Sequence, residues 1–499
     1  MNTHAGEKSD GGIVPEKRSN NGRRLPAETV EGRPPPKGNG DQTTAVRTQS
    51  RVAASDGLVA VRQAARQGKK VRFTALLHHI TIELLERSYF ALNRHSAPGI
   101  DGVTWQAYGE NLEENLTDLH GRIHRGSYRA RPGRRTYTPK PDGSRRPLSV
   151  LCLEDKIVQQ AAVYVLEAIF EEDFLGISYG FRPGRGPHDA LDALHAGIYR
   201  KRVDWVLDAD IQGFFDAMSH KWMMRFLRHR IADKRMLRLI AKWLKVGIAE
   251  AGQIKPSSRG TPQGAVISPI LANIYLHYVL DLWAHRWRRK SASGDVIIIR
   301  YADDIVLGFQ HEHEARAFLH DLQIRMRKFE LALHPDKTRL IRFGRHAVEQ
   351  CGRLGQGKPE TFDFLGFTHF CTKSWVTGHF VIGRQTIKKR MLAKLRVIKM
   401  ELRQRWHDPV AETGAWLHKV LTGHLNYYAV PLNARSLHWF FNRVCRMWLR
   451  ALNRRSQRAS VTWAKLQRLI TRFLPPIKIR HPLPCHRFDA RTQGRSPVR

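Results

Sequence analysis

Two short apolar runs separated by a pair of adjacent aspartates constrain this chain more than any other stretch. Val296–Ile299 and Ile305–Leu307 are rich in Val and Ile, which is typical of buried strands, and the polar break between them indicates a hairpin turn. Asp303 and Asp304 lie in that break. Burying unpaired anions is very unfavourable, so carboxylates held between core strands require a cation, and hard oxygen ligands select Mg²⁺. Taken alone, such a pair more often caps or solvates a loop.

The charge balance indicates a polyanionic partner. The 499 residues include 84 Lys and Arg against 45 acidic residues, a formal net charge of +39. A compact chain with this imbalance repels itself unless a polyanion neutralises it, which favours nucleic acid. No apolar run approaches the roughly 18 residues of a membrane helix, and no signal peptide pattern follows Met1. We therefore expect no membrane partner and a cytoplasmic location. The five cysteines are widely spread, which supports neither a disulfide framework nor a zinc finger.

Composition and periodicity divide the chain into segments of different character. Residues 1–65 are rich in Gly, Pro, Asn, Ser and basic residues and lack an apolar period, which predicts a disordered basic leader. A helical pattern begins near Phe73, and strand-like runs alternate with helices between about 150 and 370, which predicts an α/β core. Beyond a second hairpin signal at Trp375–Ile382 the chain becomes helical and more basic, up to Pro475 and Pro476.

A two-metal site needs carboxylates from at least two chain segments, and Asp204–Asp216 supplies a second one. This stretch has the pattern of a short strand that ends in acids, followed by Gly and a helix start. Asp208 and Asp210 would face the same side of an extended strand, so periodicity alone does not choose between them. We expect Asp216 to cap or orient the following turn.

The stretch Gly260–Pro269 combines two glycines with Ser-Pro before an apolar run. Ser268 as N-cap and Pro269 as the first helical residue predict a helix start. The glycine-bearing loop before it allows the backbone to approach a ligand closely. An ordinary junction between a loop and a helix would have the same pattern.

The region after the second hairpin combines one apolar helix face with many cations. The predicted apolar stripe consists of Ile387, Met391, Leu395, Ile398 and Leu402. A run of charges is usually only a solvated face, but here it recurs with interleaved aromatic residues, which favours a nucleic-acid-binding surface. The candidate RNA-binding residues are Lys388, Lys389, Lys394, Arg443, Arg446, Arg450, Arg454 and Arg455.

Several motifs together resemble the reverse transcriptases encoded by group II introns. Residues 301–304 spell Tyr-Ala-Asp-Asp, the run from Asp210 matches Asp-Ile-x-Gly-Phe-Phe-Asp, and residues 260–264 spell Gly-Thr-Pro-Gln-Gly. Further matching blocks, in the order of the family, are Ala97–Thr104, Pro139–Leu148, Ser178–Gly184, His334–Thr338 and Phe362–Phe367. The resemblance covers residues from about 73 to 370. The joint occurrence of these blocks makes chance agreement negligible.

The resemblance implies a right-hand polymerase fold, in which an α/β fingers and palm region is followed by an all-α thumb. The expected domains are the leader over 1–65, an N-terminal extension and fingers over 66–200, a palm with interleaved fingers elements over 201–370, a basic helical thumb or maturase domain X over 371–475 and a short basic C-terminal tail over 476–499. Many relatives add a C-terminal endonuclease, which is not expected in a sequence that ends at Arg499.

The resemblance also implies roles for individual residues. Asp210, Asp303 and Asp304, together with the backbone carbonyl of Ile211, are expected to hold two Mg²⁺ ions as the catalytic centre. The nucleotide-binding residues that it implies are Lys140 and Arg146 at the triphosphate, Phe215 beneath the sugar, Gln263 along the nascent base pair and Lys337 near the active site. Phe215 would clash with a ribose 2′-OH and so favour dNTPs.

The implied function is that of an RNA-directed DNA polymerase and maturase. Such a protein binds its own intron RNA, assists splicing and copies that RNA into DNA at a DNA target, using a primer strand and dNTPs. One alternative is a maturase that only assists splicing, which the intact acidic residues and Lys140, Arg146 and Lys337 disfavour. Another is a bacterial reverse transcriptase of the retron or diversity-generating type, which the early sequence blocks and the basic helical region disfavour.

Overall fold

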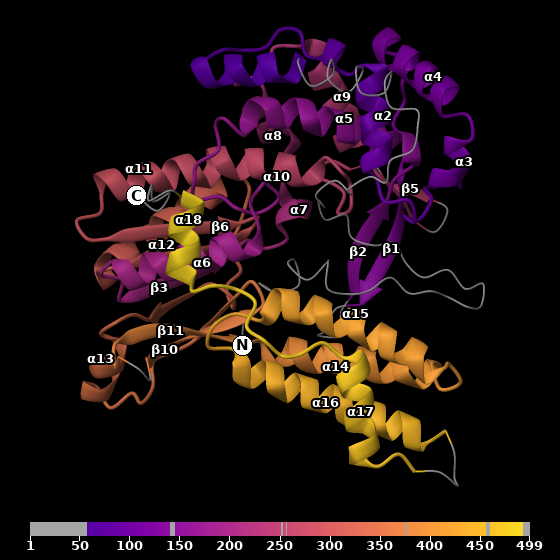
Figure 1. The fold of residues 1–499 in the computed structure, drawn as a ribbon. Helices are drawn as coiled ribbons and strands as arrows, with labels where there is room; N and C mark the ends of the chain where they lie inside the picture. The colour runs from indigo at the N-terminus through magenta and orange to yellow at the C-terminus, as the bar shows by residue number, and fades with distance from the viewer. Residues whose placement is uncertain are drawn as a thin grey trace.

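The computed structural model describes residues 57–139, 145–250, 253–255, 257–374, 377–455 and 460–492 (Figure 1). Lys140 and most of the predicted leader lie outside these residues. The described part of the leader is helical, because residues 57–67 form a helix that buries Val61 and Ala65. These two residues lie four positions apart on one helix face, a signal that the polar composition around them obscured.

The N-terminal region packs helices against a small mixed sheet. Its elements are the 3-10 turn η1 (Leu77–His79), α2 (Ile82–Ala91), α3 (Trp105–Gly109), α4 (Leu112–Arg125), β1 (Gly133–Pro139), β2 (Arg145–Val150) and α5 (Leu153–Phe170). Helix α2 begins after Thr81, whose hydroxyl accepts a hydrogen bond from the backbone N–H of Leu84 at 3.2 Å. The sheet has the order β2-β1-β4-β5, completed by β4 (Ile248–Glu250) and β5 (Gln253–Lys255).

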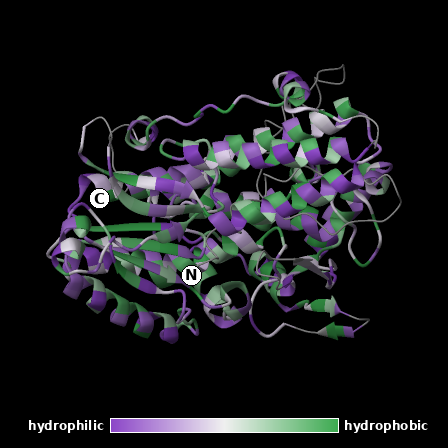
Figure 2. Ribbon diagram, turned by 90° about the horizontal axis from the view of Figure 1, so that it is seen from below, coloured by the Kyte–Doolittle hydropathy of each residue, from purple (hydrophilic) through white to green (hydrophobic). Residues whose placement is uncertain are grey.

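The central sheet explains why the apolar runs of the sequence are continuous instead of alternating. Its antiparallel strands follow the order β6 (Val296–Tyr301), β7 (Asp304–Phe309), β3 (Trp205–Asp210) and β8 (Arg339–Arg342). Ile297 packs into the core that contains α6 (Pro187–Arg200), and Ile298 packs into the core that contains α12 (Glu312–Lys328). Both faces of the sheet are therefore buried. Figure 2 shows these strands mostly green, while the helices mix green and purple.

The other elements around the central sheet are α7 (Phe214–Ala217), α8 (His220–Leu227), α9 (Lys234–Lys245), α10 (Ser268–Leu276), the π-helical turn η2 (His277–Asp281), α11 (Leu282–Lys290) and α13 (Ala347–Arg353). The prediction that Ser268 caps α10 is wrong. Ser268 is already helical, and its hydroxyl lies 3.0 Å from the Pro262 carbonyl and 2.6 Å from the Thr261 hydroxyl. The hydroxyl therefore binds the preceding loop, and Pro269, predicted as the first helical residue, is the second one, because α10 begins at Ser268.

A second antiparallel sheet leads into a helical bundle. It has the order β11-β10-β9 and consists of β9 (Phe362–Phe364), β10 (Phe367–Lys373) and β11 (Phe380–Thr386). The C-terminal bundle follows, with α14 (Lys388–Gln404), α15 (Val410–Tyr428), α16 (Ala434–Asn453) and α17 (Trp463–Phe473). The predicted apolar stripe is confirmed, because its five residues are all buried. Figure 1 shows the bundle below the central sheet, with α14 and α15 in orange and α17 in yellow.

The last described helix, α18 (Pro484–Thr492), leaves the bundle and packs along α6 of the central region (Figure 1). Arg200 and Asp489 form a bidentate pair with two N···O distances of 2.7 Å, and Arg487 bonds Asp192. The segment predicted as a short basic tail thus contains a helix that specific ion pairs fix to α6.

No helix in the described part of the chain combines the length and apolar character needed to span a bilayer. All five cysteines are free thiols.

Candidate active site

The adjacent aspartates lie on a tight turn between two central strands. Tyr301 pairs with Asp304 at the end of the β6–β7 ladder, which leaves Ala302 and Asp303 as a two-residue loop. Ala302 has a φ of +55°, as required at the first loop position of the hairpin turns that match strand twist. Residues 301–304 are called the aspartate turn below. Asp303 and Asp304 are each only 4% exposed, so both carboxylates are held inside the protein.

Strand register brings a third carboxylate beside this turn. In the antiparallel pair of β3 and β7, Asp210 lies directly opposite Asp304. Side chains in such opposite positions have Cβ atoms about 5 Å apart. Asp208 lies opposite Val306, one step further from the turn, although it shares the face of Asp210. The structure thus places Asp210, and not Asp208, next to the aspartate turn.

The loop that precedes β8 supplies a cation at the end of β3. The Lys337 Nζ lies 3.5 Å from Asp210 Oδ2, and the backbone N–H of His334 donates to the Asp210 carbonyl at 2.8 Å. Ile211 forms an antiparallel bridge with Leu333 in which the flanking residues carry the hydrogen bonds. The Ile211 carbonyl therefore accepts neither of the two hydrogen bonds of this bridge.

The glycine-bearing loop joins the centre of the molecule to the N-terminal hairpin. The backbone N–H of Thr261 donates to the Phe215 carbonyl at 2.8 Å, and Ser149 on β2 donates its N–H to the Gln263 carbonyl at 2.7 Å. A Cβ on Gly264, whose φ is +97°, would lie 2.9 Å from the Ser149 carbonyl oxygen. The loop thus fixes Phe215 and Gln263 relative to β2, and the glycine is needed for the close backbone approach.

The two predicted triphosphate residues, Lys140 and Arg146, belong to the β1–β2 hairpin region. Arg146 lies on β2 opposite Thr138 and is half-buried. Lys140 follows β1 and lies outside the described residues.

Asp216, predicted to cap or orient a turn, lies in α7. The pKa of its carboxyl is raised, because the effect of burial exceeds the opposite effect of nearby Arg135.

The donor set fits Mg²⁺ by its chemistry. Asp210 at the end of β3, Asp303 in the turn and Asp304 at the start of β7 are hard oxygen ligands, and all three are buried. Among the described residues, no three His, Cys, Asp or Glu side chains already form a metal-binding cluster. Mg²⁺ is usually held by one or two carboxylates together with waters and substrate phosphates, so it does not require a closed protein cage. Carboxylates brought together where β3 ends and β7 begins are compatible with that mode of binding.

Sequence reasoning assigned no role to two residues that contact the aspartate turn. Arg300 is 0% exposed, and its Nη1 donates to the Ala302 carbonyl at 2.9 Å. Gly180 lies against the turn, where an added Cβ would come within 3.1 Å of Ala302 Cα. The available signal for Arg300 was a charged residue inside a strand that is apolar on both faces.

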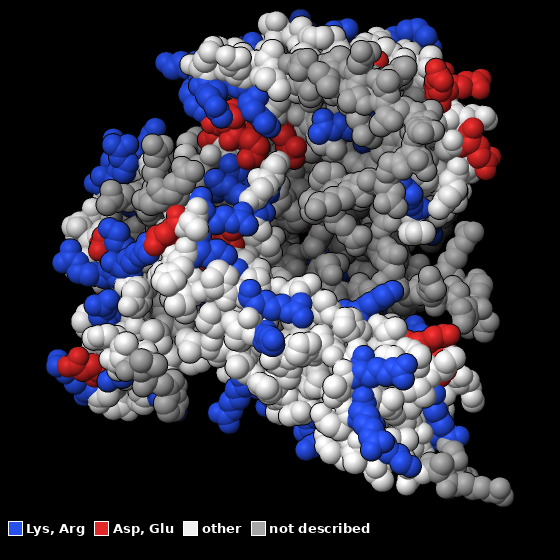
Figure 3. Space-filling view, viewed as in Figure 1, with Lys and Arg blue, Asp and Glu red and all other residues white. Residues whose placement is uncertain are grey.

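Most of the candidate RNA-binding residues lie at the surface of the C-terminal bundle. Lys388, Lys389, Arg443, Arg446, Arg450 and Arg454 are exposed, and Lys394 is half-buried. Figure 3 shows several blue side chains on the otherwise mostly white surface of this part of the molecule. Arg455 differs, because its guanidinium donates to the carbonyls of Asp408 at 2.8 Å and Arg405 at 3.2 Å. Its charge is engaged within the bundle.

Comparison with known proteins adds independent information. Residues 138–369 match the family model described as reverse transcriptase (RNA-dependent DNA polymerase). Protein YkfC of Escherichia coli K12 is 35% identical over 272 residues, which cover 48% of this chain and 71% of YkfC. The group II intron-encoded protein LtrA of Lactococcus lactis is 38% identical over 175 residues, 34% of this chain and 29% of LtrA.

A plant protein extends the range of similar sequences. Nuclear intron maturase 4, mitochondrial, of Arabidopsis thaliana is 30% identical over 144 residues, which cover 28% of this chain and 17% of that protein. The match to LtrA likewise covers less than a third of its length.

Proposed function

Because the chain belongs to the reverse transcriptase family, in its branch of intron-encoded reverse transcriptases and maturases, we propose that it binds a group II intron RNA, assists its splicing and copies it into DNA at a DNA target. The family supports RNA-directed DNA polymerase activity. The observation that carries the catalytic part is the register that sets Asp210 opposite Asp304, with Lys337 3.5 Å from Asp210. In this proposal the central sheet is the palm, the N-terminal region the fingers and the C-terminal bundle the thumb.

The proposed site has separate parts for metal, nucleotide and template. Asp210, Asp303, Asp304 and the Ile211 carbonyl would hold two Mg²⁺ ions, which lower the pKa of a primer 3′-OH and neutralise the leaving pyrophosphate. Lys337 balances the negative charge beside Asp210 and adds a fixed cation near the transferred phosphate.

The nucleotide is positioned by groups from three elements. The Phe215 ring would lie beneath the sugar, and Gln263 along the nascent base pair, because the loop of residues 260–264 is hydrogen-bonded to both α7 and β2. Arg146 and Lys140 would meet the triphosphate from the β1–β2 hairpin. Charge that develops on the phosphates is stabilised best by cations fixed in place before the reaction.

The proposed RNA surface is the exposed basic face of the C-terminal bundle. Exposed cations bind RNA mainly through phosphates, while specificity comes from RNA shape and unpaired bases. The names of LtrA and of the Arabidopsis maturase refer to introns, which supports an intron RNA as the partner.

A splicing-only maturase is the second candidate function. Such a protein has no need of three buried carboxylates beside one another, since each buried charge costs free energy without a cation. A retron-type or diversity-generating enzyme would share the carboxylates, and the similarity to intron-encoded proteins favours the intron assignment over it.

The decisive experiment is extension of a DNA primer on an RNA template with Mg²⁺ and dNTPs. Asp303→Asn should abolish extension, because the neutral amide lacks the negative charge with which the carboxylate holds a divalent metal. Asp208→Asn is the matched control: it changes the same group on β3, but two residues further from the turn than Asp210. Undiminished extension by Asp303→Asn, or equal loss in both variants, would contradict the assigned site.

A further inference from the structure

Arg300 is a fully buried cation one residue away from the aspartate turn. It lies on β6, and its guanidinium binds Asp281 through two parallel contacts, Nε to Oδ1 at 2.7 Å and Nη2 to Oδ2 at 2.6 Å. Asp281 is the last residue of the π-helical turn η2. Paired contacts of this kind fix the plane of the guanidinium as well as its position.

The remaining donors of Arg300 reach the turn and its surroundings. Nη1 donates to the Ala302 carbonyl at 2.9 Å and to Asn273 Oδ1 at 3.0 Å, and Nη2 donates to Ser178 Oγ at 2.7 Å. All five N–H groups of the guanidinium are thus engaged. The carbonyl that Arg300 binds belongs to the peptide that links Ala302 to Asp303.

A second support presses on the turn from the segment of residues 177–180. Ser178 and Arg300 form a parallel bridge, with N–H groups of Tyr179 and Arg300 donating to carbonyls across it. The Gly180 carbonyl accepts from Asn273 Nδ2 at 2.8 Å. A Cβ on Gly180 would lie 3.0 Å from the Tyr301 carbonyl carbon and closer still to the Ala302 nitrogen. No side chain fits at this position unless the turn moves.

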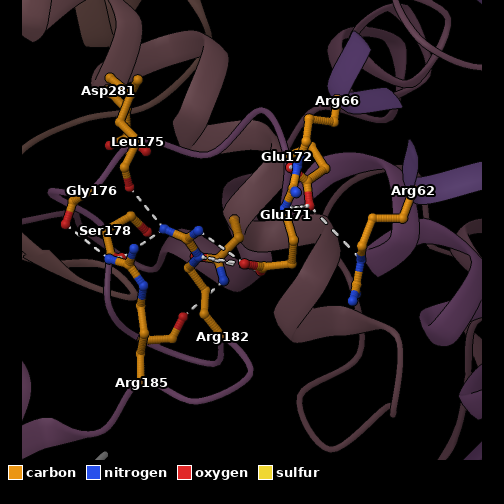
Figure 4. A network of polar contacts seen from close by, with 12 residues as sticks. Arg62, Arg66, Glu171, Glu172, Leu175, Gly176, Ser178, Arg182, Arg185 and Asp281 are labelled. Atoms are coloured by element: carbon orange, nitrogen blue, oxygen red, sulfur yellow. Dashed lines mark hydrogen bonds and ion pairs between the residues drawn. The ribbon is translucent and has the colours of Figure 1, made fainter. Parts of the chain in front are cut away.

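Two arginines, Arg182 and Arg185, hold the segment of residues 175–178 through its backbone carbonyls. Arg182 binds Glu171 at 2.9 Å and donates to the carbonyls of Leu175 at 2.8 Å and Ser178 at 2.9 Å. Arg185 donates to the Gly176 carbonyl at 2.9 Å. Figure 4 shows the two guanidinium groups pointing into the loop formed by residues 175–178. The segment that packs against the turn is therefore fixed to Glu171, the residue that follows α5.

We propose that Arg300, held by Asp281 and Asn273 and opposed by Gly180, is a positioning residue that sets the place of Asp303 and Asp304 and thereby the affinity of the site for its divalent metal. Ala302, with its positive φ, has no steric preference for the observed turn, so an external bond to its carbonyl has to hold it. Partners that orient metal ligands typically change metal affinity by about 10- to 100-fold when they are removed. This inference rests on the proposed metal-binding function of the three aspartates.

The test compares two variants of this support with two matched controls. Gly180→Ala adds a methyl group that clashes with the backbone of the aspartate turn. Arg300→Lys keeps the positive charge but loses the two parallel contacts with Asp281. Gly197→Ala crowds Ile297 on the same strand β6, where a Cβ would lie 2.9 Å from Ile297 Cδ1, away from the turn. Arg384→Lys alters another buried arginine, which pairs with Asp192 at 3.4 Å.

Two readouts separate positioning from general stability. Mn²⁺ binding to the full-length protein without nucleic acid is measured by electron paramagnetic resonance, and the half-saturating Mg²⁺ concentration is measured in primer extension. Gly180→Ala and Arg300→Lys should weaken Mn²⁺ binding and raise the Mg²⁺ requirement by about tenfold. The control variants should change the Mn²⁺ affinity and the half-saturating Mg²⁺ concentration by less than about twofold. This should hold even where they lower the thermal midpoint, because distant sites act independently.

A graded variant keeps the inference testable if Arg300→Lys does not fold. Ser178→Ala removes one of the five hydrogen bonds of the Arg300 guanidinium and should raise the Mg²⁺ requirement less than Gly180→Ala does. Unchanged metal binding in both Gly180→Ala and Ser178→Ala would overturn the positioning role. If Asp303→Asn itself binds Mn²⁺ and extends primers normally, the proposed function fails instead, so the two failures are distinguishable.

Discussion

The aspartate turn and the C-terminal bundle both depend on charge, but they place it in opposite environments. Around the turn, Asp303 is 4% exposed and Arg300 is 0% exposed, and each lies within a fixed set of neighbours. On the bundle, Arg446 and Arg450 are exposed to solvent. Buried charges act at short range and are hardly screened, whereas exposed charges act over several ångströms and weaken with salt.

This difference has a functional consequence. A single substitution near the turn removes an interaction that no neighbour can replace, so its effect is large and independent of salt. A single substitution on the bundle removes one of many cations, so its effect is small and depends on salt. The two regions should therefore be separable by experiment.

The largest expected effect is loss of polymerisation without loss of RNA binding. Asp210→Asn removes a carboxylate opposite Asp304 and should lower primer extension by a factor on the order of 10³, since each metal contributes several kcal/mol to the transition state. Intron RNA affinity and assisted splicing should remain close to those of the unmodified protein, because few phosphate contacts change. Primer extension, RNA affinity and splicing are measured on one preparation. Parallel loss of extension and of RNA binding would show that the carboxylates also support the RNA-bound fold.

A smaller effect is expected from Phe215, which acts by shape and not by charge. Phe215→Ala should raise the ratio of ribonucleotide to deoxyribonucleotide incorporation by about 10- to 100-fold, because it removes the steric clash with a 2′-OH. Phe215→Tyr keeps the ring and should preserve the discrimination. The ratio of kcat/KM values is measured at two salt concentrations and should not depend on salt. Unchanged exclusion of ribonucleotides by Phe215→Ala would show that another residue is the gate.

The β6–β7 hairpin could be predicted from the sequence because strands buried on both faces leave long runs of Val and Ile. The choice between Asp208 and Asp210 could not be made from residue patterns alone, because both share one face. Only the pairing of β3 with β7 sets Asp210 opposite Asp304. Resemblance to a family pointed to Asp210, whereas periodicity left the question open.

Features that depend on distant contacts were missed. Helix α18 was predicted as a tail because its stabilising partners, Arg200 and Asp192, lie almost 300 positions earlier in the chain. Ser268 has the pattern of an N-cap, but its hydroxyl binds the loop of residues 261–262 instead. Arg300 is marked in the sequence only as a charge inside an apolar strand, and its side-chain partners Asp281, Asn273 and Ser178 lie in three other segments that no local pattern identifies. Local patterns predict elements, and they do not predict which buried polar groups meet.

The next effect concerns the exposed arginines of α16. Replacing Arg446, Arg450 and Arg454 together by Ala should weaken intron RNA binding and flatten its dependence on salt. Each lost phosphate contact reduces the slope of log affinity against log salt by about 0.7 to 0.9. Splicing at low Mg²⁺ should fail before extension of a preannealed primer does. An unchanged slope would show that these residues form only a solvated face. Equal loss of splicing and of primer extension would indicate that they bind nucleic-acid duplexes in general and do not recognise the intron.

The smallest expected effect separates two neighbouring arginines that the sequence treats alike. Arg455 donates to the carbonyls of Asp408 and Arg405, which close the connection between α14 and α15, whereas Arg454 is exposed. Arg455→Ala should leave those carbonyls without their donor and lower the stability of the bundle by about 1–3 kcal/mol, with little change in the salt slope of RNA binding. Arg454→Ala should leave the thermal midpoint nearly unchanged and reduce the slope. Thermal unfolding and RNA binding across a salt series are measured on both variants. If Arg455→Ala lowered the slope while preserving stability, its guanidinium would have to leave the carbonyls and face RNA, and the distinction between engaged and exposed charges in this bundle would be lost.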